Sequence, residues 1–384
     1  MTIATGYCTN VHAGADLPTT RANLERHTLE VKRLVSPDHP MGVGLWLCAE
    51  AARSLRQSGL DDFAAWLREV GLVPFTFNGF PYGDFHQPIV KHRVYEPTWA
   101  DPKRLDYTLD LVAIQDALLP PGMEGSISTM PIAWGRQPPD ALFQAAAANL
   151  RRLADALARL EAEQGRTIYV CLEPEPGCVL HRADDIVRFF DAHLGTDPAV
   201  RRHLRVCHDV CHSAVMFEPQ EEALRTYAAA GVLIGKVQVS SAIQLDFKPL
   251  SPTQRVEAVQ QFRAFAEDRY LHQTSVRAPG EASVLHEDLP RLLDAVADPA
   301  ALESEWRTHF HMPIHQTRFG HLSSTQDDIL ALLTACRRHS DVRHFEVETY
   351  AWSVLPPALR PARLADGIAD EMRWFDLVQR SMAL

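Results

Sequence analysis

The chain has 384 residues, of which 46% are hydrophobic and 23% charged, a composition typical of a globular protein with a large core. Its 38 Lys and Arg residues and 49 Asp and Glu residues give a formal net charge of −11. Nucleic-acid binding depends on concentrated Lys and Arg, so this balance argues against a nucleic-acid partner.

Nine short segments rich in β-branched or aromatic residues alternate with long amphipathic segments along the chain. Their length and composition are typical of buried parallel strands. The predicted strands are 4–9, 42–48, 72–78, 126–131, 168–173, 204–209, 234–239, 309–314 and 344–350.

The helices predicted between these strands have recognisable ends. The segment 140–164 carries a leucine stripe and stops at Gly165, a residue type common just after a helix end. Ser324 to Asp327 matches a capping box and is predicted to open a helix over the following apolar run. A closing amphipathic helix is expected over 364–382.

Alternation of strands and helices about eight times predicts an α/β fold, a closed (β/α)₈ TIM barrel, as a single domain over 1–384. Nine predicted strands compete for eight places, so one of the last three is expected outside the barrel wall. The irregular region 242–306, after the seventh strand, is interpreted as a loop insertion that covers the top of the barrel.

The N-terminal sequence MTIATGYCTN has no basic segment and no apolar run of signal-peptide length. No stretch approaches the roughly 18 uncharged apolar residues of a membrane span. Seven cysteines, an odd number spread over the chain, predict reduced thiols rather than a disulfide framework. We therefore expect a cytoplasmic protein without a membrane span.

Carboxylates and imidazoles gather at the predicted carboxyl ends of three strands, where barrel enzymes carry their reacting groups. Glu173 ends the fifth strand, Asp209 ends the sixth with His212 three residues later, and Glu346 and Glu348 are in phase on the last. Several carboxylates in one barrel mouth require a bound cation or a shared proton, because an unpaired buried charge is costly. The mixed shell predicts a divalent metal such as Zn²⁺ or Mn²⁺.

These strand ends resemble the xylose-isomerase-like barrels, a superfamily of sugar isomerases and epimerases that also includes the endonuclease IV type of repair enzyme. The segment V-C-H-D-V-C-H-S-A (206–214) is particularly similar to the family's sixth strand. The resemblance implies metal-ligand positions for Glu173, Asp209, His212 and Glu348.

One position departs from the superfamily pattern. The seventh strand usually presents a metal-binding histidine, whereas this chain has Gln238 there. Either the shell is weaker and richer in oxygen, with Gln238 as a ligand, or another histidine replaces it. His309, His311 and His315 share one face of their segment, and His311 is the preferred replacement, with His272 behind it.

A longer set of segments resembles the EboE-type "metabolite traffic" family. That family is similar to sugar-phosphate isomerases and belongs to a bacterial gene cluster implicated in handling a small secondary metabolite. The segments are N-G-F-P-Y-G (78–83), V-Y-E-P-T-W (94–99), E-G-S-I-S-T (124–129), V-Q-V-S-S-A (237–242), Y-L-H-Q-T (270–274), H-F-H-M-P-I (309–314) and V-E-T-Y-A-W (347–352).

Further residues are candidates for the pocket wall, each with core packing as its alternative. The substrate-binding candidates are Asn10, His12, Trp46, Asn78, Tyr82, His272 and Trp352. Tyr350 and Trp352 are suited to stacking on a sugar-like ring or a flat metabolite. The basic run Lys91 to Arg93 suits either a phosphate or a solvated loop.

The sequence favours a metal-dependent isomerase or epimerase that acts on a small polyol or sugar-derived metabolite. Glu173 and Glu348 form its acid–base pair, at a mononuclear or dinuclear site. Other proteins of the same gene cluster, or further copies of the chain in an oligomer, are candidate partners. One alternative function is a non-catalytic metabolite carrier on the same scaffold. A second alternative, a phosphodiesterase of the endonuclease IV type, fits the metal shell but not the net charge of −11.

Overall fold

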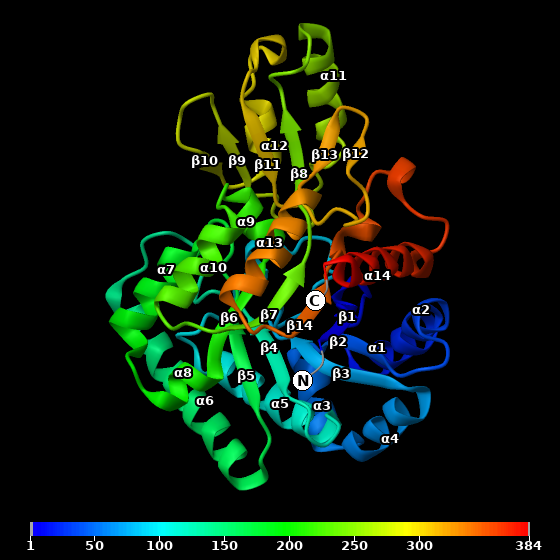
Figure 1. Ribbon diagram of the computed structural model, residues 1–384, viewed down its shortest axis with the longest axis vertical. Helices are drawn as coiled ribbons and strands as arrows, with labels where there is room; N and C mark the ends of the chain where they lie inside the picture. The colour runs from blue at the N-terminus through cyan, green and yellow to red at the C-terminus, as the bar shows by residue number, and fades with distance from the viewer. Residues whose placement is uncertain (1–2, 383–384) are drawn as a thin grey trace.

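Eight parallel strands form a barrel at the centre of the molecule (Figure 1). The computed structural model describes residues 3–382. The barrel strands are β1 (Ala4–Tyr7), β2 (Met41–Trp46), β3 (Leu72–Asn78), β4 (Gly125–Thr129), β5 (Ile168–Leu172), β6 (Leu204–Asp209), β7 (Ile234–Val239) and β14 (His344–Val347). Their order is β1-β14-β7-β6-β5-β4-β3-β2, and a parallel bridge between Cys8 and Gly44 joins β1 to β2 and completes the ring.

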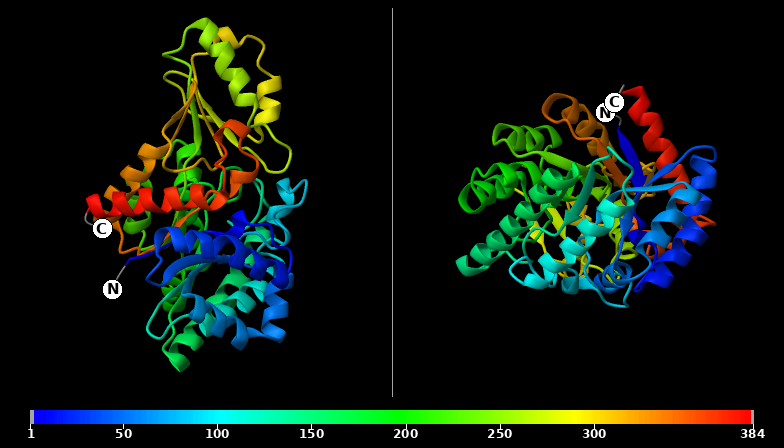
Figure 2. Two further views of the ribbon diagram at one scale, coloured as in Figure 1. Left: turned by 90° about the vertical axis from the view of Figure 1, so that its right-hand side faces the viewer. Right: turned by 90° about the horizontal axis from the view of Figure 1, so that it is seen from below.

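Helices surround the strands on the outside of the ring, as the view from below shows (Figure 2). Short 3-10 and π-helical turns, including η1 (Thr9–Val11), connect or extend them. The helices are α1 (Leu17–Asn23), α2 (Leu29–Val35), α3 (Ala49–Gln57), α4 (Leu60–Val70), α5 (Pro102–Leu118), α6 (Asp140–Gln164), α7 (Ala183–Phe189), α8 (Pro198–His203), α9 (Val210–Val215), α10 (Gln220–Ala229), α13 (Gln326–His339) and α14 (Leu364–Ser381). The predicted (β/α)₈ fold class is confirmed. Within residues 3–382, no helix combines the length and apolar character needed to cross a membrane.

The end of α6 and the start of α13 can be compared with the helix-end residues that the sequence predicts. Helix α6 ends before Gly165, which has φ of 67°, so the predicted glycine end is confirmed. The predicted capping box at the start of α13 is wrong, because the cap residue is Thr325 and its side chain makes no capping bond. Its hydroxyl accepts from the backbone N–H of Ala242 instead, while Ser324 donates to a loop carbonyl.

A second, antiparallel sheet stands over the carboxyl end of the barrel, between β7 and α13 (Figures 1 and 2). Its order is β10-β9-β11-β8-β13-β12. Its elements are β8 (Ile243–Asp246), α11 (Pro252–Arg263), β9 (Thr274–Arg277), β10 (Val284–His286), α12 (Leu289–Asp294), β11 (Glu305–Thr308), β12 (Arg318–Phe319) and β13 (Leu322–Ser324). The segment interpreted as a loop insertion, 242–306, therefore lies in a folded sheet that continues to Ser324.

This sheet also decides which predicted strand lies outside the barrel wall. The prediction of a strand over 309–314 is wrong, because that segment is extended chain leaving β11. It returns from the second sheet across the barrel mouth, where its histidines lie in the cavity described below.

A buried ion pair fills the barrel interior below the mouth. Lys236 Nζ lies 2.6 Å from Glu346 Oε2, and both side chains are fully buried. A Cβ atom at Gly44 would overlap the Glu346 carboxylate, so the absence of a side chain at Gly44 makes room for it. Glu346, which the sequence places in phase with Glu348 on the same strand, is thus bound in an ion pair with Lys236.

Candidate metal centre

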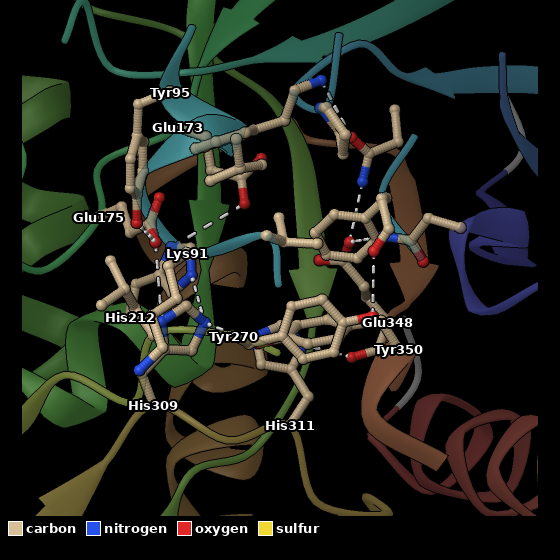
Figure 3. A pocket seen from close by; sticks show the side chains of 18 residues that line it. Lys91, Tyr95, Glu173, Glu175, His212, Tyr270, His309, His311, Glu348 and Tyr350 are labelled. Carbon is tan, nitrogen blue, oxygen red and sulfur yellow. Dashed lines mark hydrogen bonds and ion pairs between the residues drawn. The ribbon is translucent and has the colours of Figure 1, made fainter. Parts of the chain in front are cut away.

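A cavity with an empty volume of about 530 Å³ opens between the barrel mouth and the second sheet (Figure 3). Glu173 and Glu348 enter it directly after β5 and β14, and His212 enters from α9. Tyr270 and His311 enter it from the region between β7 and α13. The site is therefore built jointly by the barrel and its insertion.

Three buried carboxylates meet at the barrel mouth, two of which, Glu173 and Glu348, line this cavity. One oxygen from each of Glu173, Asp209 and Glu348 lies within 4.8 Å of the other two. Parallel strands bring their carboxyl ends to the same rim, which explains why residues far apart in sequence converge there. Three ionised carboxylates at this spacing repel one another strongly unless a cation or protons neutralise them.

The acid–base properties of the three groups reflect this crowding. Burial, followed by the charges of Glu348 and Asp209, raises the pKa of Glu173 well above its usual range. Burial, followed by the charge of Asp209, does the same to the pKa of Glu348. Burial also acts to raise the pKa of Asp209, but His212 and His311 outweigh it and hold that pKa below its ordinary value.

Two histidines present their Nε2 atoms to Asp209. His212 Nδ1 donates to the Pro174 carbonyl at 2.9 Å, and His311 Nδ1 donates to the Glu348 carbonyl at 2.6 Å. These bonds fix both rings, so the Nε2 atoms lie 4.0 and 3.8 Å from Asp209 Oδ2. A backbone acceptor at one ring nitrogen is the usual device that orients a metal-binding histidine.

The donor atoms that face the centre are left without partners. Among residues 3–382, Glu173 Oε2, Asp209 Oδ2 and His311 Nε2 are buried and have no hydrogen-bond partner. Native proteins pair nearly all buried polar atoms, so this cluster indicates a site built for a ligand. Carboxylate oxygens with imidazole nitrogen form a shell that fits a divalent cation such as Zn²⁺ or Mn²⁺.

Gln238 occupies the position on β7 where the resemblance implies a histidine. Its Cα pairs with those of Asp209 and Glu346 on the neighbouring strands. Both atoms of its buried amide lack a partner within the described part of the chain. His311, which follows β11 of the insertion, nevertheless places an imidazole beside Asp209, where β7 itself provides none.

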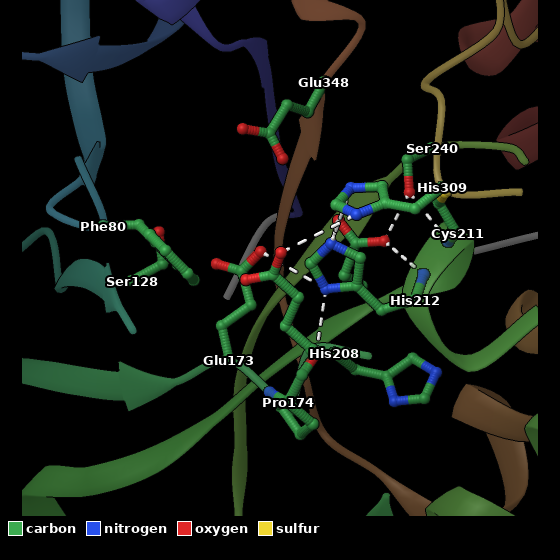
Figure 4. Close-up of polar contacts among 12 residues, drawn as sticks. Phe80, Ser128, Glu173, Pro174, His208, Cys211, His212, Ser240, His309 and Glu348 are labelled. Atoms are coloured by element: carbon green, nitrogen blue, oxygen red, sulfur yellow. Dashed lines mark hydrogen bonds and ion pairs between the residues drawn. The ribbon is translucent and has the colours of Figure 1, made fainter. Parts of the chain in front are cut away.

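A second polar group, which the sequence did not single out as a unit, adjoins the first. Glu175 Oε1 accepts from Tyr95 at 2.7 Å and from Gln273 Nε2 at 3.0 Å. His309 Nδ1 donates to Gln273 Oε1 at 2.8 Å, and its Nε2 lies 3.2 Å from His212 Nε2 (Figure 4). In the sequence, the segments E-P-E-P (173–176) and H-F-H (309–311) indicate polar residues near the mouth. They do not reveal that the insertion brings Gln273 into contact with Glu175.

Two predicted wall residues lie in the cavity as positioning groups. Asn10 and Asn78 each donate through Nδ2 to Glu348 Oε1, at 2.7 and 2.8 Å. They hold this carboxylate from the barrel side and leave Glu348 Oε2 for other partners. Tyr350 also lines the cavity.

His12, Trp46 and Tyr82 lie outside the cavity lining. The ring of His12 stacks on His27 with centroids 4.8 Å apart. Trp46 Nε1 donates to the Pro81 carbonyl at 3.2 Å, and Tyr82 packs edge-on against Tyr107. His12 lies outside the cavity because β1 ends at Tyr7, and the turn η1 then breaks the alternation of side chains that a longer strand would have.

His272 and Trp352 are also engaged elsewhere. His272 is fully buried in the insertion, where Nδ1 donates to the His309 carbonyl and Nε2 contacts Glu267 at 2.9 Å. Trp352 Nε1 donates to Glu371 Oε2 at 3.3 Å. The structure therefore places both side chains in packing positions.

No family model and no curated protein matches the chain. Among solved structures it is similar to the IOLI protein, determined with a bound zinc atom, at 13% identity over 98% of this chain and 99% of that one, with a TM-score of 0.50. It is also similar to a xylose isomerase-like TIM barrel protein from Mycobacterium smegmatis in complex with magnesium, at 12% identity over 99% of this chain and 97% of that one, with a TM-score of 0.54. Likeness at this level of identity shows the fold alone, a (β/α)₈ TIM barrel.

Proposed function

We propose that the protein is a divalent-metal-dependent isomerase or epimerase acting on a small polyol, sugar or sugar-derived metabolite. One observation carries the proposal: three buried carboxylates converge at the carboxyl end of a barrel beside an oriented imidazole, and buried atoms of Glu173, Asp209 and His311 are unpartnered within residues 3–382. Zinc and magnesium are present in the two similar solved structures, and this supports a metal without identifying it.

Glu173, Asp209, His311 and Glu348 would hold the ion, with His212 and Gln238 beside them. A bound divalent cation supplies Lewis acidity, which polarises a carbonyl oxygen and makes the neighbouring C–H more acidic. The rest of the work falls to side chains of this chain.

Glu173 and Glu348 are the acid–base pair in this proposal. They come from β5 and β14, on different sides of the ring, so a substrate carbon between them has a carboxylate on each face. One takes the proton from that carbon and the other returns a proton to its opposite face, which inverts the centre. A carbonyl moves instead when the proton returns to the former carbonyl carbon and the hydroxyl proton passes to the former carbonyl oxygen. Asn10 and Asn78 restrict the rotation of Glu348 by binding its Oε1.

Handling of a secondary metabolite, as the EboE-type motifs suggest, is compatible with this chemistry. The carrier alternative depended on the missing imidazole of the seventh strand. Since His311 supplies an imidazole beside Asp209, at 3.8 Å between Nε2 and Oδ2, we favour catalysis.

The test combines metal analysis with proton exchange. The purified protein and its Glu173→Gln and Glu348→Gln variants are analysed for bound metal, then incubated with candidate ketoses and keto-polyols in D₂O with Mn²⁺ or Zn²⁺. We expect wild-type protein to incorporate deuterium at the exchanged carbon and both variants to lose this activity. Glu257→Gln, at a 58% exposed side chain on α11, is the matched control. Unchanged metal content and exchange in both site variants would refute the proposal, and binding without any exchange would favour the carrier.

A further inference from the structure

The cavity has two chemically different halves. The barrel floor supplies carboxylates and imidazoles, whereas the outer wall is largely apolar. That wall is formed by residues of the β3–α5 loop and of the insertion, including Phe80, Phe85, Val94, Tyr270 and Leu271. Specific pockets commonly combine an apolar wall with a few placed polar groups, and here the two kinds of surface are separated.

Three aromatic side chains, Phe85, Tyr270 and Tyr350, pack together and form an aromatic face in the outer half. Figure 3 shows the two tyrosines. The Phe85 ring centroid lies 4.9 Å from that of Tyr270 and 5.4 Å from that of Tyr350, and the two tyrosine rings are 5.1 Å apart. The Tyr350 ring is 4.6 Å from the His311 ring. The apolar face thus begins directly beside the metal donors, so one small molecule can touch both.

Positive charge is scarce in the same cavity. Of the lining residues within 3–382, Lys91 is the one Lys or Arg. Its Nζ lies 2.5 Å from Asp288 Oδ2, and the Asp288 side chain is only 8% exposed. Lys91 has φ of 38°, and its backbone N–H donates to the Arg269 carbonyl, which ties this loop to the insertion. Among the described lining residues, the Lys91 ammonium group is therefore already paired with the Asp288 carboxylate.

A phosphate group would enter this cavity without a free cationic partner. Phosphate sites in proteins use several charge-assisted donors, most often from Arg and Lys. Glu173, Glu175 and Glu348 line the cavity instead. These carboxyl groups offer no cationic partner to a dianion, and each one that is ionised repels it.

We propose that the substrate is an uncharged polyol or hydroxy-ketone with an apolar substituent, bound with its oxygens at the carboxylate floor and the substituent against the Phe85–Tyr270–Tyr350 face. The position of the oxygens rests on the proposed function. The preference for the substituent follows from the outer wall. The rejection of phosphate follows from the lining carboxylates and from the pairing of Lys91 with Asp288, and neither preference needs a metal.

Binding of three matched probes tests this assignment: glucose, hexyl β-D-glucopyranoside and glucose 6-phosphate. Each is titrated calorimetrically into metal-free and Mn²⁺-loaded protein. We expect the hexyl glucoside to bind at least tenfold more tightly than glucose, about 1.4 kcal/mol, in both forms. Glucose 6-phosphate should bind more weakly than glucose in the metal-free protein.

Val94→Ser and Asp288→Asn, each with a control, connect these preferences to named residues. Val94→Ser should reduce the hexyl advantage severalfold, while Val256→Ser, at a 38% exposed valine on α11, should leave it unchanged. Asp288→Asn keeps an acceptor for the His272 N–H but frees Lys91, so affinity for glucose 6-phosphate should rise severalfold. Adding Lys91→Met to this variant should remove the gain.

Equal affinity for glucose and its hexyl glucoside, absence of binding by the hexyl glucoside, or tighter binding of glucose 6-phosphate by metal-free wild-type protein would each overturn the inference. Failure of the proposed function gives a different pattern, namely retained hexyl preference with no metal-dependent proton exchange. Proton exchange without a hexyl preference would overturn the inference alone.

Discussion

Replacing one floor carboxylate should change stability in opposite directions in the metal-free and metal-loaded protein. In the metal-free protein, Glu173→Gln removes a group that must either repel Asp209 and Glu348 or take up a proton to avoid doing so. Two full charges at 4.8 Å, the upper limit for the separations in this cluster, interact by roughly 3 kcal/mol at an effective dielectric of about 20. We therefore expect Glu173→Gln to stabilise metal-free protein by about 2–3 kcal/mol at pH 7.

The same substitution should weaken the stabilisation that metal provides, because an amide is a poorer ligand than a carboxylate. Thermal unfolding in EDTA and in excess Mn²⁺ measures both effects, with the exposed Glu257→Gln as control. A Glu173→Gln protein that is less stable than wild type in EDTA would refute the reasoning, since Glu173 would then form a favourable local bond. An undiminished response to Mn²⁺ would remove Glu173 from the metal shell.

Three further predictions follow from the geometry. His311→Ala should weaken Mn²⁺ or Zn²⁺ binding at least tenfold by calorimetry. His315 is on the same segment but outside the cavity lining, so His315→Ala should leave the metal affinity unchanged. Equal metal affinities of the two variants would exclude His311 as a ligand. Lys236→Met should lower the free energy of unfolding by about 3–5 kcal/mol in chemical denaturation, because it leaves the buried Glu346 carboxylate without its partner. Adding Glu346→Gln should recover part of the lost stability. A loss below about 1 kcal/mol in Lys236→Met alone would contradict the role of the pair. Burial, followed by the charge of Lys236, lowers the pKa of His344 from 6.5 to about 3, so its contribution to stability is present above pH 6.5 and is lost as the pH falls toward 3. His344→Asn should therefore flatten the stability profile by about 2 kcal/mol between pH 6.5 and 5, and parallel profiles would contradict this.

The barrel strands were predictable because each is a short apolar run buried on both faces, and eight of the nine predicted segments are barrel strands. The ligand candidates were predictable for a related reason. Glu173, Asp209 and Glu348 stand at the carboxyl ends of such strands, so the fold alone brings them together.

The insertion was harder to predict from the sequence. Its strands are two to four residues long, too short for an alternation pattern, and its pairings join segments as distant as β8 and β13. Gln273 and His309 reach Glu175 only through this sheet, so their network has no local signal. His12 lies outside the cavity lining for a local reason, since a turn ends the strand earlier than its composition suggested.

Anomalous X-ray diffraction from crystals grown with Mn²⁺ tests the central claim most directly. The account predicts one strong anomalous peak in contact with the side chains of Glu173, Asp209, His311 and Glu348, with the Asp209 Oδ2 and His311 Nε2 atoms turned toward it. Density for water alone at that position, with each carboxylate bonded to a separate neighbour, would contradict the claim that these residues form a metal centre.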